Sequence, residues 1–265
     1  MAAEYVIIDI ETTGLNPKRD AIIEVAAVKL RHGLVIDELS SLIQPQRPVP
    51  AEITNLTGID DNMLLGCPTM EEFRFVLNAF LGQAVPLAHN ALFDSSFLGP
   101  YLESEVEWLD TLALAQIAFP CQTSYALGNL AEDLQISDEG AHRALADARM
   151  TAALFQKAED ALEALPAKTK ASLYSLAEGE ENALCRYIAG RFTAYAEKPA
   201  AIFPAQSPPL YANAEERQVD DTYQLDNATV ASYFAPGGAF EQRIAGFENR
   251  PQQLQMATEV AAAFN

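Results

Sequence analysis

The chain has 265 residues, 37 of them acidic and 17 basic, so its formal net charge is −20, and 49% of its residues are hydrophobic. This composition excludes a disordered chain, and the length predicts one full domain plus a smaller unit. The acidity excludes a basic DNA-binding tail, so any contact with nucleic acid must be short and local.

No run reaches the ~18 apolar residues that a membrane span requires, and the N-terminus lacks a secretion signal. We therefore expect a cytoplasmic protein that does not contact a membrane. The three cysteines, Cys67, Cys121 and Cys185, are scattered and odd in number. They predict neither a disulfide framework nor a zinc site.

The first 43 residues carry three strand patterns. Residues 4–11 include the run Tyr5–Ile8, which is apolar on both faces and predicts a buried central strand. Residues 22–30 and 34–43 predict two more strands, joined by a short turn, so that the three form an antiparallel meander.

Helical patterns dominate the rest of the first part of the chain. A short strand is predicted at 85–88, and helices are predicted at 70–81, 91–102, 111–118, 127–134 and 143–165. Strands followed by a strand between helices indicate a mixed α/β sandwich.

The pattern changes beyond Pro166. Helical stretches at 171–177 and 182–195 precede four prolines between 199 and 209, which predict a boundary or a surface connector. A last helix is expected from Pro251, and the chain stops while still helical in character, which suggests a fragment of a longer protein.

Two carboxylates share one side of the first strand. Asp9 and Glu11 are two residues apart, and strand side chains two apart point the same way. Like charges at this spacing raise each other's pKa values, and a divalent cation removes the repulsion. The alternative is a strand end where both groups are simply hydrated.

Two further segments, around Asp94 and around His142–Asp147, give only weak evidence of a functional site when each is taken alone. Asp94 follows the predicted strand 85–88, but it could be an ordinary acid in the first turn of a helix. Arg143 and Asp147 could form a surface pair at the start of a helix. His142 would be turned away from Asp147 on a straight helix, so we expect it on the loop or first turn.

Taken together, these groups resemble the DnaQ-like (DEDDh) 3′→5′ exonucleases. The motifs stand here as Asp9-Ile10-Glu11-Thr12-Thr13-Gly14-Leu15, His89-Asn90-Ala91-Leu92-Phe93-Asp94 and His142-Arg143-Ala144-Leu145-Ala146-Asp147. The resemblance covers about residues 4–158. It implies an α/β, RNase H-like mixed sheet flanked by helices, followed by a smaller helical C-terminal extension.

The resemblance also implies a two-metal site for Mg²⁺ or Mn²⁺. Asp9 would bridge both ions, Glu11 and Asp147 would hold the ion beside the attacking water, and Asp94 would hold the ion at the leaving group. His142 would be the general base that takes the proton of the water.

Substrate contacts are implied at the same motifs. Thr12, Gly14 and Leu15 would receive the 3′-terminal nucleotide, with the leucine beside the last base. His89 and Asn90 would position the strand or the Asp94 loop, although such a pair can also cap a helix. Leu92 and Phe93 are expected in the core.

The C-terminal segment has a separate resemblance. Arg250, Gln253 and Met256 match an Arg-x-x-Gln-x-x-Met pattern that precedes the ATPase core of DinG-type helicases, where the glutamine recognises adenine. A glutamine-rich surface helix is the alternative. The phosphate loop G-x-x-x-x-G-K-[ST] is absent from the sequence, so we expect that this chain does not bind ATP.

The sequence therefore predicts three parts: an exonuclease domain at 1–160, a helical and proline-rich connector at 161–238, and the start of a helicase-like region at 239–265. The predicted activity is release of nucleoside 5′-monophosphates from single-stranded 3′ ends, of DNA rather than RNA. The alternatives are an RNA-trimming exonuclease and a non-catalytic module that docks strand ends or a partner.

Overall fold

The computed structural model describes residues 4–104, 106–137, 140, 142–196, 227–235 and the single positions 238, 240, 242, 254, 255, 257 and 258. Its strands are β1 (Glu4–Thr12), β2 (Ile22–Arg31), β3 (Leu34–Leu42), β4 (Val85–Ala88) and β5 (Leu109–Asp110). Its α-helices are α1 (Ala51–Thr57), α2 (Asp61–Leu64), α3 (Met70–Leu81), α4 (Leu92–Leu98), α5 (Thr111–Ala118), α6 (Leu127–Asp133), α7 (Ala144–Glu163), α8 (Ala167–Ala177), α9 (Ala183–Phe192) and α10 (Asn227–Phe234).

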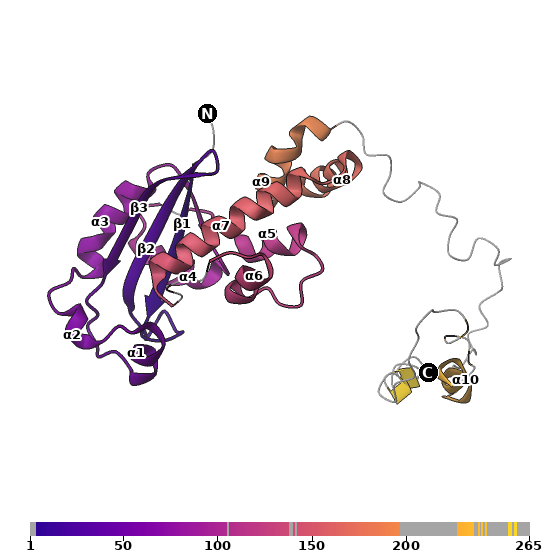
Figure 1. Cartoon of the computed structure of the whole chain (residues 1–265), viewed down its shortest axis with the longest axis horizontal. Coiled ribbons are helices and arrows are strands. Elements are labelled where there is room, and N and C mark those ends of the chain that lie inside the picture. The colour runs from indigo at the N-terminus through magenta and orange to yellow at the C-terminus, as the bar shows by residue number, and fades with distance from the viewer. Residues whose placement is uncertain are drawn as a thin grey trace. The chain divides into compact units, whose positions relative to one another are not determined.

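The strands form one mixed sheet in the order β3-β2-β1-β4-β5 (Figure 1). The first three strands make the predicted antiparallel meander, and β4 adds to β1 in parallel. The prediction of a buried central strand is confirmed, because β1 lies between β2 and β4 and its run Val6–Ile8 is at most 1% exposed.

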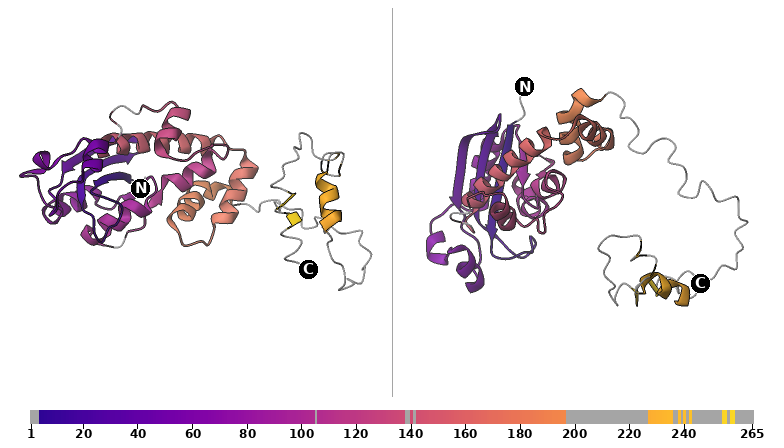
Figure 2. Two further views of the ribbon diagram at one scale, coloured as in Figure 1. Left: turned by 90° about the horizontal axis from the view of Figure 1, so that it is seen from below. Right: turned by 45° about the vertical axis from the view of Figure 1, so that its right-hand side comes forward.

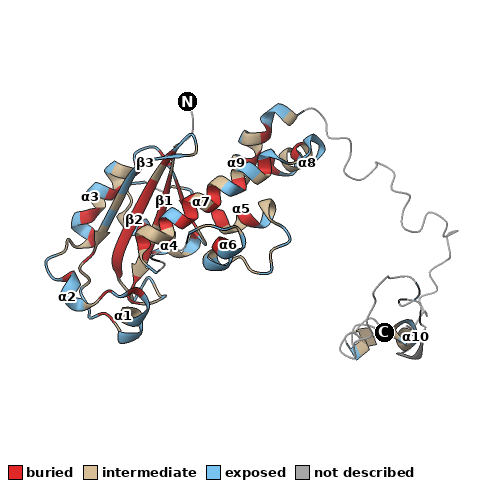
Figure 3. Cartoon of the chain, viewed as in Figure 1, coloured by how far each residue is buried: buried red, intermediate tan, exposed pale blue. Residues whose placement is uncertain are grey.

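Helices cover both faces of this sheet, so the core has two halves (Figure 2). On one face, Ile7 and Val28 pack with the alanine-rich side of α7 around Phe155. On the other face, Val6 and Ile8 pack with α3. Figure 3 shows the buried residues concentrated along the sheet and the inner side of α7. Alternate residues of β1 therefore face opposite helical layers.

Helices α8 and α9 follow the predicted boundary at residue 160, but they pack on the same core half as α7. Ala177, Ile188 and Phe192 are buried there with Phe155. The contacts divide the chain into units 1–202 and 203–265. The division into an exonuclease domain, a connector and a helicase-like start remains a prediction.

Most predicted elements lie within a few residues of the observed ones, and four elements of the described residues were missed. The predicted helix 91–102 ends as an α-helix at Leu98 and continues as a short 3₁₀ turn over Gly99–Tyr101. Helices α1, α2 and α10 and the two-residue strand β5 were not predicted, because elements of two to eight residues give little periodicity. Most of the expected helix from Pro251 lies outside the described residues. No helix in the described part is both long and apolar enough to cross a membrane.

Candidate active site

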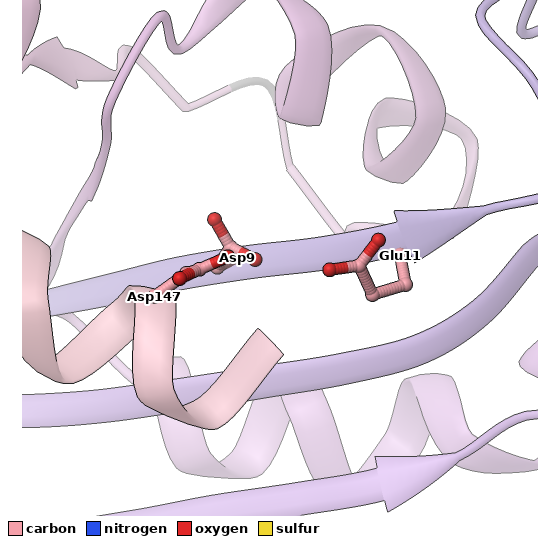
Figure 4. A group of neighbouring side chains, drawn as sticks. All are labelled: Asp9, Glu11 and Asp147. Carbon is pink, nitrogen blue, oxygen red and sulfur yellow. The ribbon is translucent and has the colours of Figure 1, made fainter. Parts of the chain in front are cut away.

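Three carboxylates converge where β1 meets the start of α7. Asp9 and Glu11 point from β1 toward the α7 face, on the side that buries Ile7. Asp147 lies in the first turn of α7, and Figure 4 shows its carboxylate beside that of Asp9. One oxygen from each of the three groups lies within 4.8 Å of the others, close enough to hold a cation.

Asp94, from helix α4, adds a fourth carboxylate. It is 4% exposed in the first turn of α4, directly after the strand β4 that pairs with β1. Its charge is the largest of those that raise the pKa of Asp9, so the two carboxylates are close neighbours. It stands outside the three-residue group, which suits a second ion shared with Asp9.

Burial and mutual repulsion make these four groups reluctant to ionise without a cation. Burial is the largest cause of the raised pKa at each, and neighbouring acids add to it. The pKa of Glu11 is raised to about 7 and that of Asp94 to about 8. Carboxylate oxygens are the ligands that Mg²⁺ and Mn²⁺ prefer. These donors therefore fit a divalent metal centre.

These pKa shifts predict that the metal-free protein loses stability as the pH rises. The folded state keeps protons at Glu11 and Asp94 up to about pH 7–8, whereas the unfolded chain releases them near pH 4. The free energy of unfolding therefore decreases as the pH rises from about 4 to about 8. In EDTA, we expect the thermal midpoint to be at least about 5 °C lower at pH 8 than at pH 5. Thermal scans of wild type and Asp94→Asn check this; an equal slope in both would contradict it.

His142 lies on the turn before α7, as predicted. Its backbone has a φ of 66°, and its N–H donates to Asp147 Oδ2 over 3.3 Å. The side chain is exposed. The turn therefore holds the histidine backbone next to a carboxylate of the cluster, and the role of general base remains a prediction.

The loop after β1 is tightly organised. The Thr12 hydroxyl donates to the Gly14 carbonyl over 2.6 Å. A Cβ on Gly14 would lie 2.6 Å from the Asp20 carboxylate, which in turn accepts the N–H of Asn16. A side chain at position 14 would therefore displace the Asp20 carboxylate from this contact. The same loop leaves Leu15 84% exposed, as a residue that contacts a base would have to be.

His89 and Asn90 are held by the protein rather than directed at one another. The His89 ring nitrogens lie 3.0 Å from Thr111 Oγ1 and 2.8 Å from the Tyr125 carbonyl oxygen, so both are engaged. The Asn90 N–H donates to Asp110 Oδ1 in a backbone conformation with φ 64°. These contacts favour positioning of the β4–α4 turn that leads to Asp94.

The prediction that Leu92 lies in the core is wrong. Leu92 is 78% exposed, because the first turn of α4 directs it away from the sheet. Phe93 is partly buried against the α3 half of the core, and its ring lies 5.2 Å from that of Phe97. The site therefore has a second exposed apolar side chain, beyond Leu15, that was not predicted.

A buried ion pair beside the cluster was also missed. Glu24 is 2% exposed and lies opposite Glu11 in the β1–β2 register. It binds Arg143, for which a surface pair with Asp147 had been left open as an alternative. A single charge in the apolar run Ile22–Val28 was the signal that could have found it.

Comparisons with known proteins match this architecture. The model of the exonuclease family matches residues 6–155, which is more than half of the chain. The chain belongs to this exonuclease family. The predicted DnaQ-like (DEDDh) membership and the assignment to the 3′–5′ exonuclease class are thereby confirmed.

Similar proteins differ in length and context. The chain is 39% identical over 177 residues to the PolC-type DNA polymerase III of Clostridium perfringens, covering 63% of this chain and 12% of that one. It is 30% identical to the 3′-5′ exonuclease DinG of Bacillus subtilis over 274 residues, covering 98% of this chain and 29% of that one. The chain thus spans only a small part of these relatives.

Solved structures confirm the RNase H-like class. Exonuclease X bound to a 5′-overhanging duplex DNA matches with a TM-score of 0.51 and 30% identity, covering 59% of this chain and 91% of that one. The nuclease domain of 3′hExo, a DEDDh family member bound to rAMP, matches with a TM-score of 0.54 and 18% identity, covering 60% and 92%. The mixed sheet flanked by helices is the shared feature.

Proposed function

We propose that the chain is a metal-dependent 3′→5′ exonuclease that releases nucleoside 5′-monophosphates from single-stranded DNA ends. The observation that carries this proposal is the convergence of Asp9, Glu11 and Asp147 within 4.8 Å, with Asp94 as an electrostatic neighbour of Asp9. Four carboxylates carry a charge of −4, which two divalent cations would neutralise.

Two Mg²⁺ or Mn²⁺ ions would be held by these four side chains. Asp9 belongs to the three-residue group and has Asp94 as its strongest charged neighbour, so it would contribute to both sites, with Glu11 and Asp147 completing one and Asp94 the other. Bound ions of this kind supply a reactive water and stabilise charge on the phosphate. His142, on the adjoining turn, would accept the proton of the water.

The strand end would be received between the first two motifs. Leu15 and Leu92 expose apolar side chains, one four residues after Glu11 and the other two residues before Asp94, and would offer faces for the terminal base. Lys18 and Arg19 are exposed on the Leu15 loop and supply positive charge for the strand phosphates. Thr12, Gly14, His89 and Asn90 would line the position of this strand end.

The salt dependence of binding tests this short basic contact. Two side-chain contacts to single-stranded phosphates predict a slope of log affinity against log salt of about −1.4. We expect a slope no steeper than about −2 at fixed Mn²⁺, and a shallower one for Lys18→Gln/Arg19→Gln. Fluorescence anisotropy with an Asp9→Asn chain measures it. A slope beyond about −4 would mean that other basic side chains bind the strand.

The test of the function is hydrolysis of 5′-labelled oligonucleotides. Wild type with Mg²⁺ or Mn²⁺ should give a ladder that shortens from the 3′ end, and EDTA should stop it. Cleavage rates on DNA and RNA strands of the same base sequence show which sugar the enzyme prefers, because only RNA carries the 2′-hydroxyl. The RNA alternative is favoured by the structural neighbour bound to rAMP. Binding of both strands without cleavage would support the docking module instead.

We further propose that this domain is the N-terminal part of a DinG-like protein. The similarity to DinG extends over 98% of the chain, well beyond the exonuclease family match. The Gln253 pattern supports the same view, although it lies largely outside the described residues. Since the phosphate loop is absent, ATP should not bind, and a filter assay with labelled ATP checks this.

A further inference from the structure

Glu24 is a buried acid that bridges the sheet and the start of α7. Its carboxylate accepts three hydrogen bonds: from Arg143 Nη2 over 2.7 Å, from Arg143 Nε over 3.1 Å and from the N–H of Ala144 over 3.1 Å. The two contacts with the guanidinium make a bidentate pair, the strongest geometry for this kind of interaction. A buried carboxylate needs such partners, so this position is specified closely.

The contact with Ala144 caps α7 from outside the helix. Arg143 is the N-cap residue, and its side chain makes no capping hydrogen bond. Glu24 therefore supplies the oxygen that a local serine or aspartate would usually provide, at the end of the helix where a negative charge is stabilised. The first turn of α7 is thereby attached to β2.

This attachment affects the first and the third motif at once. Asp147 lies one turn after Ala144, and His142 lies two residues before it. On the other side, Glu24 is the direct cross-strand neighbour of Glu11. The distance between Asp147 and the β1 carboxylates therefore depends on a contact made by a residue outside all three motifs.

We propose that Glu24, with Arg143, is a positioning residue that sets the distance of Asp147 and His142 from Asp9 and Glu11. The inference rests on the metal-dependent nuclease proposed above. Outer partners that orient metal ligands are commonly worth 10- to 100-fold in metal affinity or activity. Loss of this pair should weaken metal binding and turnover by about that factor while KM changes little.

Charge alone predicts a different pattern, which makes the proposal testable. Glu24→Gln makes the site less negative and Arg143→Gln makes it more negative, so a pure field effect on a bound cation has opposite signs. Arg143→Lys keeps the charge but cannot form the bidentate pair, so a field effect leaves it like wild type. Positioning predicts weaker binding in all three variants.

Glu38 and Arg149 provide a matched control. They also form a bidentate pair between the sheet and α7, from β3 to the second turn of the helix, but both side chains are solvent-accessible and neither residue belongs to a motif. Glu38→Gln therefore removes a similar pair from the same helix. We expect metal binding and turnover within about twofold of wild type.

The experiment measures three properties of the full chain: the Mn²⁺ dissociation constant by calorimetry, kcat and KM on a labelled strand, and the thermal midpoint in EDTA. Weaker Mn²⁺ binding and lower kcat by about 10-fold or more in Glu24→Gln, Arg143→Gln and Arg143→Lys, with KM within about twofold, support the proposal. Changes in Mn²⁺ affinity of opposite sign in Glu24→Gln and Arg143→Gln, or wild-type affinity and kcat in Arg143→Lys, overturn it. Equal losses in Glu38→Gln also overturn it.

The outcomes separate this proposal from the function itself. If wild type binds Mn²⁺ but cleaves no strand, the nuclease proposal fails and the calorimetric comparison still decides the role of Glu24. If Glu24→Gln does not fold, Arg143→Lys carries the decision, because that side chain is 43% exposed and keeps its charge.

Discussion

Asp9→Asn should reduce strand hydrolysis by at least about 10³-fold, because it replaces the charged carboxylate that both metal ions would share with a neutral amide that has only one oxygen. Metal ions contribute several kcal/mol to charge stabilisation in such reactions, and 1.4 kcal/mol corresponds to a factor of ten. The measurement is kcat on a 5′-labelled strand at saturating Mn²⁺. Asp37→Asn, an exposed change on β3, is the matched control and should act like wild type.

The same substitution should stabilise the metal-free fold. Asp9 is surrounded by Asp94, Asp147 and Glu11, each of which raises its pKa, so a neutral amide relieves repulsion. In EDTA the thermal midpoint should rise, whereas added Mn²⁺ should stabilise wild type more than the variant. Retained hydrolysis, or a lowered midpoint in EDTA, would contradict the assignment of Asp9 as a shared ligand.

His142→Gln should lower kcat by about 10²–10⁴-fold, the usual contribution of a general base. The Mn²⁺ dissociation constant should stay within about twofold of wild type, because His142 is not among the carboxylates that would hold the ions. Calorimetry and single-turnover hydrolysis measure the two effects separately.

His32→Gln is the matched control for this prediction. His32 is an exposed histidine with a positive φ of 53° on the β2–β3 turn, so it shares the backbone strain of His142 without its location. Its substitution should leave kcat unchanged. A His142→Gln chain that cleaves at the wild-type rate would exclude the histidine as the base and assign the proton transfer to another group.

The sequence predicted the sheet well because its strands have strong and simple patterns. The run Tyr5–Ile8 is apolar on both faces, which only a central strand with helices on each side can bury. Helix α3 was predicted with the observed ends from the helical spacing of its apolar residues, and the structure adds a capping box of Thr69 and Glu72 and a C-cap at Gly82. Short elements such as α2 and β5 depend on tertiary contacts and left no comparable pattern.

The site was predicted as a set of motifs, but not as a set of contacts. The order of Asp9, Glu11, Asp94, His142 and Asp147 carried the family resemblance, and the structure brings the first, second and last together. Pairing between distant segments could not be predicted, so Glu24 was passed over and the only partner considered for Arg143 was Asp147. Leu92 was assigned to the core because periodicity does not say which face of a seven-residue helix such as α4 meets the sheet.

Diffraction from crystals of the chain soaked in Mn²⁺ with a nucleoside 5′-monophosphate is the most direct measurement. Anomalous scattering should show two peaks about 3.5–4 Å apart. A carboxylate oxygen of Asp9 should lie between them, with Glu11 and Asp147 at one ion and Asp94 at the other. No peak beside Asp9, or ions bound only elsewhere on the protein, would contradict the account.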